Sequence, residues 1–138
     1  MNAKDKFIQF YEDYQVNNLK MLDELYTETV HFIDPVKEIH GLPNLKKYFI
    51  NISGNLTTCK FSFEQIDELN NCAYFHWTMN FSNKRLAKGR IKTVKGISYV
   101  RIQDSKISYQ RDYYDLGEMI YENIQCLNWA IQKIKKNL

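Results

Sequence analysis

The chain has 138 residues and a net charge of +3, a length that predicts one domain with a single core and excludes a multidomain protein. Hydrophobic and charged residues make up 44% and 25% of the sequence, an ordinary globular balance, but the aromatic share of 14% indicates broad apolar surfaces and favours an aromatic-walled cavity. The N-terminal residues lack the apolar core of a secretory signal, and no window approaches the ~20 apolar residues that span a bilayer. We therefore expect a single cytoplasmic domain over residues 1–138, with no membrane partner.

Cysteine and histidine are few and scattered. Cys59, Cys72 and Cys126 are odd in number, widely spaced and without a CxxC pattern, so we expect free thiols. The three histidines form no ligand motif, which predicts no metal site. The sequence also has no glycine-rich phosphate loop or nucleophile elbow, so we expect no cofactor.

A basic segment covers residues 84–95 and contains no acidic residue. Its cations are Lys84, Arg85, Lys88, Arg90, Lys92 and Lys95. Such a run can meet phosphates, but it is also typical of a solvated hairpin whose charges protect a sheet edge. No recognisable nucleic-acid motif accompanies it, so we expect no nucleic-acid partner.

The first half of the chain is predicted to be mostly helical. Apolar residues recur at helical spacing over 7–14 and again over 19–26, which predicts two successive helices. Residues 30–34 form a short run of β-formers that is stopped by a proline. A proline at the first helical position then predicts a third helix over 43–52, with His40 in the turn before it.

The second half is predicted to be a sheet followed by a helix. From residue 58 onward the apolar period changes to two, with strands around 61–66, 75–81, 97–102 and 107–111. A long apolar stripe then predicts a C-terminal helix over about 116–137, which must pack on its own sheet or on a partner. This order indicates an α+β fold with a mostly antiparallel sheet.

Two acids stand at strand ends. Asp34 closes the first short strand, and Asp112 lies in the last one. If the fold brings them to one apolar cavity, desolvation would raise the pKa of a carboxyl toward neutrality and make acid/base chemistry available. The alternatives are a backbone cap for Asp34 and a structural partner of an Arg or Tyr for Asp112.

Strand alternation assigns faces to the neighbouring side chains. Asp112 shares a face with Gln110 and Tyr114, whereas Arg111 points to the opposite face. The alternation places Trp77 and Met79 together on a face that is core or cavity wall.

His40 precedes the third helix and is placed to reach Asp34, which would give a carboxylate and an imidazole in one site. The alternative is a surface or turn histidine.

Six motifs together carry a family resemblance. They are Phe32–Pro35, Ile39–Leu42, Trp77–Met79, Gly96–Ser98, Lys106–Ile107 and Arg111–Asp115. The chain resembles the nuclear transport factor 2-like superfamily, in particular its SnoaL-like branch, over nearly its whole length. The resemblance implies a cystatin-like cone in which a curved sheet packs around N-terminal helices, with a C-terminal helix, an apolar cavity and a homodimer formed through the outer sheet face. That fold serves isomerases, cyclases, epoxide hydrolases, dehydratases and noncatalytic proteins, so it does not assign a function.

The resemblance also assigns positions to site residues. In ketosteroid isomerases the general base is the Asp of an Asp-Pro-Val, which Asp34 matches, while the two oxyanion-hole positions fall at Phe10 and Ser98. Neither residue is the Tyr or Asp that this chemistry uses, so steroid isomerisation in its familiar form is not expected. In SnoaL-like cyclases the base on the last strand corresponds to Asp112, and Gln110 stands where a His is frequent.

The sequence therefore predicts a pocket for a small apolar or aromatic molecule. If the protein is an enzyme, Asp112 is the expected base, Asp34 a second acid/base group, and Tyr114 and Gln110 hydrogen-bond donors. Trp77, Met79, His40, Ser98 and Phe10 are the further expected pocket residues. The alternative is a noncatalytic ligand sensor or protein-interaction module, and the volume of the cavity discriminates between the two.

Overall fold

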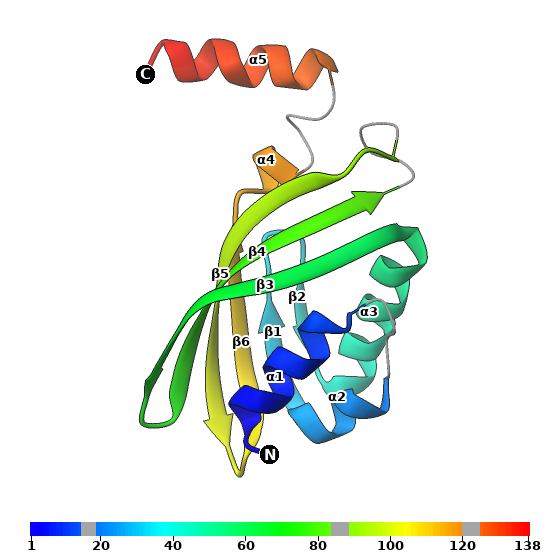
Figure 1. Ribbon diagram of the computed structural model, residues 1–138, viewed down its shortest axis with the longest axis vertical. Helices are drawn as coiled ribbons and strands as arrows, with labels where there is room; N and C mark the ends of the chain where they lie inside the picture. Colours follow the sequence, from blue (N-terminus) through cyan, green and yellow to red (C-terminus); the bar gives the residue numbers. More distant parts are fainter. Residues whose placement is uncertain (15–18, 84–88, 120–124) are drawn as a thin grey trace.

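The computed structural model describes residues 1–14, 19–83, 89–119 and 125–138. Its elements, in chain order, are α1 (Ala3–Glu12), α2 (Lys20–Leu25), β1 (Tyr26–Ile33), β2 (Glu38–His40), α3 (Leu42–Asn55), β3 (Leu56–Leu69), β4 (Cys72–Asn83), β5 (Lys92–Gln103), β6 (Lys106–Tyr114), α4 (Leu116–Met119) and α5 (Gln125–Lys136). Helices at both ends and a sheet between them confirm the predicted α+β class (Figure 1).

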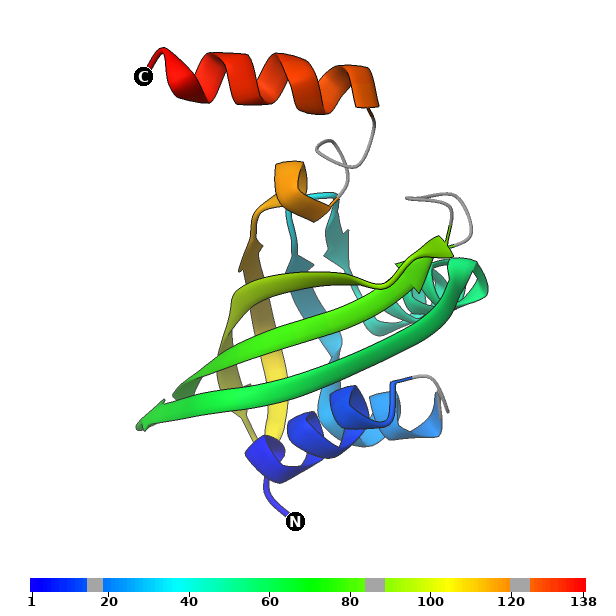
Figure 2. The same cartoon turned by 45° about the horizontal axis from the view of Figure 1, so that its top comes forward.

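The described strands form one sheet in the order β2-β1-β6-β5-β4-β3. Strand β1 pairs in parallel with β6, and the remaining neighbours pair antiparallel. The long strands β3, β4 and β5 curve across α1 and α3, as Figure 2 shows from a second angle. The predicted sheet is therefore confirmed as mostly antiparallel, and its single parallel pair becomes important for the site.

Aromatic side chains attach the helices to the inner face of this sheet. Phe7 of α1 stacks on Phe75 of β4 with ring centroids 4.0 Å apart, and Phe49 of α3 lies edge-on to Phe32 of β1. Both helices carry apolar residues at spacings of three and four, so one stripe of each faces the sheet. The core therefore lies between the sheet and these two helices.

Several predicted boundaries in the first half are wrong. The second helix ends at Leu25, and β1 begins at Tyr26 rather than at residue 30. Strand β2 was not predicted, and His40 is its last residue rather than part of a turn. Because β2 has three residues and only Ile39 is buried, it is too short to produce a recognisable period.

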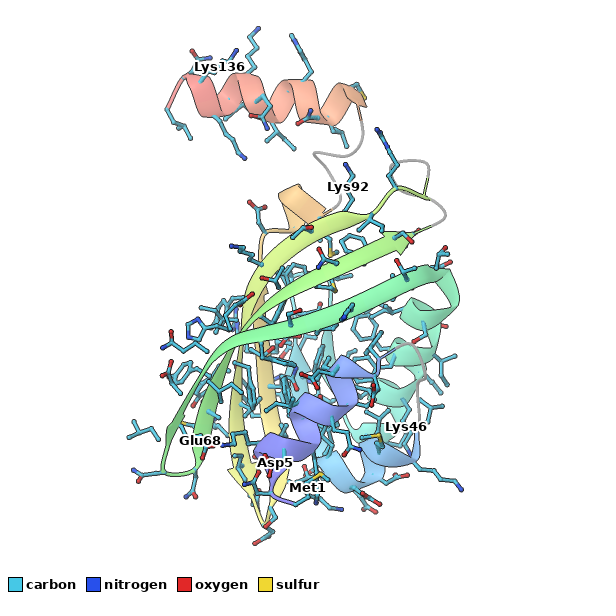
Figure 3. All side chains as sticks on the ribbon, in the orientation of Figure 1. Met1, Asp5, Lys46, Glu68, Lys92 and Lys136 are labelled. Atoms are coloured by element: carbon cyan, nitrogen blue, oxygen red, sulfur yellow. The ribbon has the colours of Figure 1, made fainter. Side chains whose placement is uncertain are left out.

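The predicted C-terminal helix over 116–137 is described as two helices, α4 and α5, and residues 120–124 lie outside the described residues. In Figures 1 and 3, α5 stands apart from the sheet. Leu127, Trp129 and Ile134 are 42%, 66% and 63% exposed, so within the described residues the apolar stripe is not packed on the sheet. Residues 84–88 of the basic segment also lie outside the described residues. Among the described helices, none has the length and hydropathy needed to cross a membrane.

Candidate functional site

A cavity of about 270 Å³ lies between the inner face of the sheet and helices α1 and α3. Its apolar lining comes from Phe7, Phe32, Phe49, Ile52, Leu56, Phe61, Phe63, Trp77, Met79, Phe81 and Met119. The volume is near the small end of the range for ligand pockets, which runs from roughly 300 to 1,000 Å³. A small apolar molecule is the kind of ligand that such a lining accepts.

Asp34 and Asp112 both line this cavity. The parallel pairing of β1 with β6 brings them together, because Ile33 is in register with Arg111 and each acid is the next residue of its chain. Parallel neighbours of this kind lie about 4.8 Å apart along the hydrogen-bonding direction. Two acids that are distant in sequence are thus neighbours in one apolar hollow.

The carboxylate of Asp34 is held by three donors. Its Oδ1 accepts from the backbone N–H groups of Val36 and Lys37, both at 2.8 Å, and its Oδ2 accepts from the Tyr48 hydroxyl at 2.5 Å. Asp34 therefore both caps the turn after β1 and faces the cavity, so the two alternatives drawn from the sequence are not exclusive here.

Asp112 is held differently. Its Oδ1 accepts from the Ser98 hydroxyl at 2.6 Å and from Gln110 Nε2 at 2.9 Å, and no hydrogen bond among the described residues uses its Oδ2. Burial raises the pKa of Asp112 to about 7; the hydrogen bonds from Ser98 and Gln110 oppose this rise, and the charge of Asp34 adds to it. A carboxyl with this pKa is about half ionised at neutral pH, so it can accept or donate a proton there.

A closed ring of hydrogen bonds fixes Gln110 behind Asp112. The Tyr26 hydroxyl donates to Gln110 Oε1 at 2.7 Å, and Gln110 Nε2 donates to the Tyr11 oxygen at 3.1 Å. The hydroxyl oxygens of Tyr11 and Tyr26 lie 3.0 Å apart, and since Tyr26 has one proton and gives it to Gln110, Tyr11 donates to Tyr26. The second amide proton of Gln110 goes to Asp112, so the whole amide is committed.

Further polar groups line the cavity near the acids. Trp77 Nε1 donates to Ser98 Oγ at 2.9 Å, which leaves the Ser98 proton for Asp112. Burial raises the pKa of the Tyr14, Tyr48 and Tyr114 phenols well above the usual range. These hydroxyl groups therefore stay protonated at neutral pH and act as hydrogen-bond donors.

Most residues predicted for the site are brought together. Asp34, Trp77, Met79, Ser98, Asp112 and Tyr114 line the cavity. Gln110 does not line it but lies directly behind Asp112, to which it donates a hydrogen bond. Arg111, on the opposite parity of β6, is exposed and lies over the Tyr113 ring, as strand alternation predicts.

Phe10 and His40 were also predicted to line the cavity, and the structure corrects both. Phe10 is 2% exposed and packs among the rings of Tyr11, Tyr14 and Phe49, so it belongs to the core. His40 points to the outer face of the sheet with a side chain that is 73% exposed. The reason is alternation along β2, which turns Ile39 inward and its neighbours outward.

Sequence reasoning missed three tyrosines that line the cavity, namely Tyr11, Tyr14 and Tyr48. In the sequence all three stand in the apolar stripes of predicted helices, where they are counted as core, although Tyr14 lies in the turn after α1. A phenol within an otherwise hydrocarbon stripe is the available signal, because a buried hydroxyl group needs a hydrogen-bond partner.

The curved sheet, the helices against its inner face and the hollow between them define a protein of the nuclear transport factor 2-like class. The sequence matches the SnoaL-like domain family over residues 7–110, and the chain belongs to that family. A search of curated protein sequences found no significant match.

Solved structures share the same fold. An NTF2-like protein of unknown function from Burkholderia pseudomallei is 15% identical, with a TM-score of 0.78 over 90% of this chain and 98% of that one. A putative SnoaL-like polyketide cyclase from Jannaschia is 9% identical, with a TM-score of 0.72 over 83% and 85%. An LEH-like epoxide hydrolase from M. tuberculosis is 14% identical, with a TM-score of 0.72 over 95% and 96%. At these identities the likeness establishes the fold alone.

Proposed function

We propose that this protein binds a small, largely apolar or aromatic molecule in the cavity and performs acid/base chemistry on it without a cofactor. The observation that carries the proposal is Asp112, whose pKa is raised to about 7 by burial at the wall of an apolar hollow. A carboxylate in such surroundings is suited to proton transfer next to a carbonyl or ether oxygen. The fitting reactions are isomerisation, aldol-type cyclisation, dehydration and hydration.

The hydrogen bonds suggest a role for each polar group. Asp112 Oδ2 takes the proton, since Oδ1 is already used by two donors. Tyr114 donates to a substrate oxygen, and Asp34 with Tyr48 forms the second acid/base pair. Gln110 cannot serve as the expected substrate donor because both of its amide protons are committed; it is a positioning residue for Asp112.

A noncatalytic ligand sensor or interaction module is the second candidate. It is favoured by the exposed apolar side chains of α5, which offer a surface for a protein partner. The two candidates differ in one measurable respect, because only the first requires turnover at Asp112.

Filling the cavity should abolish ligand binding. Met79 lines the hollow, so Met79→Trp is expected to occupy the space and weaken binding at least about tenfold, with a modest stability cost from overpacking. A panel of small aromatic and alicyclic ketones and epoxides, tested by calorimetry, supplies the ligands, and native mass spectrometry of the purified protein detects any retained molecule.

Lys60→Trp is the matched control, because Lys60 of β3 is exposed and the same indole placed there leaves the cavity unchanged. Equal affinities for wild type, Met79→Trp and Lys60→Trp would place the ligand elsewhere. The pocket would be rejected if wild type bound no compound of the panel and native mass spectrometry detected no retained molecule.

We also propose that the protein forms a homodimer through the outer face of the sheet. Aromatic side chains gather there: Tyr74 and Tyr113 are 41% and 54% exposed, and the Tyr74 and Tyr99 rings lie 5.0 Å apart. Exposed aromatic groups of this kind are enriched at protein interfaces. Light scattering is expected to give a dimer for wild type and a monomer for Tyr113→Asp.

Trp129→Asp is the control for the dimer, since Trp129 is a 66% exposed aromatic residue on α5 rather than on the sheet. It should leave the dimer intact. Dissociation by Trp129→Asp and not by Tyr113→Asp would move the interface to α5.

A further inference from the structure

The pairing of β1 with β2 gathers two histidines and a glutamate on the outer face of the sheet. His31 is directly opposite His40 in this antiparallel pair. Glu38 lies two residues before His40 in β2, so it points to the same side. Ile39 and Phe32, at the intervening positions, are buried in the core. Three side chains that can bind a metal therefore converge on a face opposite the cavity.

The donor atoms of this cluster are close enough for one ion. His31 Nε2 lies 2.7 Å from Glu38 Oε1, His40 Nε2 lies 3.6 Å from the same oxygen, and one donor atom from each of the three residues can be chosen so that all lie within 4.8 Å of one another. Metal–ligand bonds of about 2.0–2.2 Å place tetrahedral donors about 3.3 Å apart. Rotation of the His40 side chain, which is 73% exposed, would bring the three groups to that spacing.

The two imidazole rings lie side by side, and the exposed His40 ring must turn out of this stack for both nitrogen lone pairs to reach one ion. The rings of His31 and His40 stack with centroids 4.3 Å apart and an interplanar angle of 16°, and both direct Nε2 toward Glu38. The Tyr109 ring packs edge-on against His31 at 5.3 Å and limits its rotation. Side chains held in place by neighbours lose less entropy when they bind an ion.

We propose that His31, Glu38 and His40 form a binding site for one divalent transition-metal ion, with Zn²⁺ as the best fit. Two imidazoles and one carboxylate suit Zn²⁺ and its neighbours in the first transition row, whereas Mg²⁺ and Ca²⁺ prefer oxygen donors alone. The Glu38 and His40 side chains are 57% and 73% exposed, so an ion can enter from solvent and keep a fourth position for water. The site is independent of the cavity and of the acid/base function proposed for it. It lies on β1 and β2 at the edge of the sheet, whereas the aromatic residues proposed for the dimer lie on β4, β5 and β6.

A bound ion would also strengthen the edge of the sheet. Strand β2 has β1 as its only neighbour in the described sheet, and the ion would link the two strands through His31 and His40. These strands flank the turn of residues 34–37, which is closed by a hydrogen bond from Asp34 N to Lys37 O at 2.9 Å. The ion is therefore expected to raise the melting temperature, since the folded chain brings its three ligands together and binds it more tightly than the unfolded chain does.

Calorimetry with ZnCl₂ on the tag-free chain of residues 1–138 tests the proposal. We expect one Zn²⁺ per chain, and affinity at least about tenfold lower for His31→Gln, Glu38→Gln and His40→Gln, because each removes one of three ligands. His76→Gln is the matched control: His76 also faces a carboxylate, that of Asp67 at 3.3 Å, but with one histidine instead of two. It should bind Zn²⁺ as wild type does.

Co²⁺ absorption provides a second readout that separates this cluster from the free thiols. Binding at His31, Glu38 and His40 gives ligand-field bands without a thiolate-to-metal charge-transfer band, and Cys126→Ser leaves both metal affinities unchanged. The proposal is overturned by a charge-transfer band, by unchanged affinity in all three cluster variants, by an equal loss in His76→Gln, or by the absence of Zn²⁺ binding to wild type.

Discussion

Asp112→Asn is expected to keep ligand affinity within about threefold of wild type while turnover falls by about 10³-fold, the range that loss of a general base covers. The substitution is isosteric, and the new amide oxygen can still accept from Ser98 and Gln110 as Oδ1 does now. What it removes is the basic oxygen that faces the hollow. The measurement is kcat alongside a direct binding constant for a ligand identified in the panel. Undiminished turnover would reject Asp112 as the base.

The pH dependence of stability tests the same carboxyl without a substrate. Folding raises the pKa of Asp112 from 3.8 to about 7, so the unfolded chain releases this proton at lower pH than the folded chain does. Its contribution to stability is therefore fully present below about pH 4, declines as pH rises, and is lost above about pH 7. Asp112→Asn has no carboxyl to ionise and so lacks this loss. The free energy of unfolding of the variant minus that of wild type should therefore be about 1–2 kcal/mol larger at pH 8 than at pH 4.5.

The expected stability difference is smaller than full burial of the carboxyl would give, because the carboxyl faces a hollow and is only half-buried. Denaturant titrations of both proteins at the two pH values provide the comparison. If the stability difference between them were the same at both pH values, the carboxyl would not be desolvated, and the base proposed for the cavity would lose its physical cause. Reduced turnover in Asp112→Asn, with a stability difference that does not change between the two pH values, would instead support Asp112 as a site residue that acts through binding.

The fold could be predicted because its long elements have strong periods. The alternation of Phe75, Trp77 and Met79 along β4 specifies one inner face, and the helical stripes of α1 and α3 specify what covers it. Asp112 and Asp34 could be selected for a related reason, since each acid stands near the end of an apolar strand. Which residues share a face follows from the local spacing of apolar and polar residues, and that spacing can be read from the sequence.

What could not be predicted depends on pairing between distant segments. No local pattern reveals that β1 lies parallel to β6 with Ile33 opposite Arg111, and this register decides that the two acids meet. The same reason explains why the position of His40 was not predicted. Strand β2 has three residues and therefore no recognisable period, so the pairing of His40 with His31 becomes visible only in the folded sheet. Tyr48 was missed because its position in a helical stripe is equally suited to a core residue and to a donor for Asp34.

Gly96→Ala should destabilise the protein by about 3 kcal/mol, the upper range for overpacking a well-filled region. Gly96 of β5 is in register with Trp77 of β4, and a Cβ there would lie 2.4 Å from two atoms of the indole ring and 2.8 Å from the Tyr113 carbonyl oxygen. The carbonyl belongs to a strand and cannot withdraw. The indole is buried and donates a hydrogen bond to Ser98, so it can move only by breaking that bond, and Ser98 is in turn the donor to Asp112. Urea unfolding gives the free energy.

Gly54→Ala is the matched control, because a Cβ at Gly54 in α3 meets nothing within 4 Å and an alanine in a helix is favoured over glycine by roughly 0.5–1 kcal/mol. The two variants make the same chemical change with opposite expected signs. In a double-mutant cycle that includes Trp77→Leu alone, the shorter side chain should recover part of the loss, so Gly96→Ala should cost less in the Trp77→Leu background than in wild type, since the contact at 2.4 Å is removed. No recovery in the double variant would assign the strain to the Tyr113 backbone, and a neutral Gly96→Ala would show that the cavity wall yields, with Trp77 free to move away from Ser98.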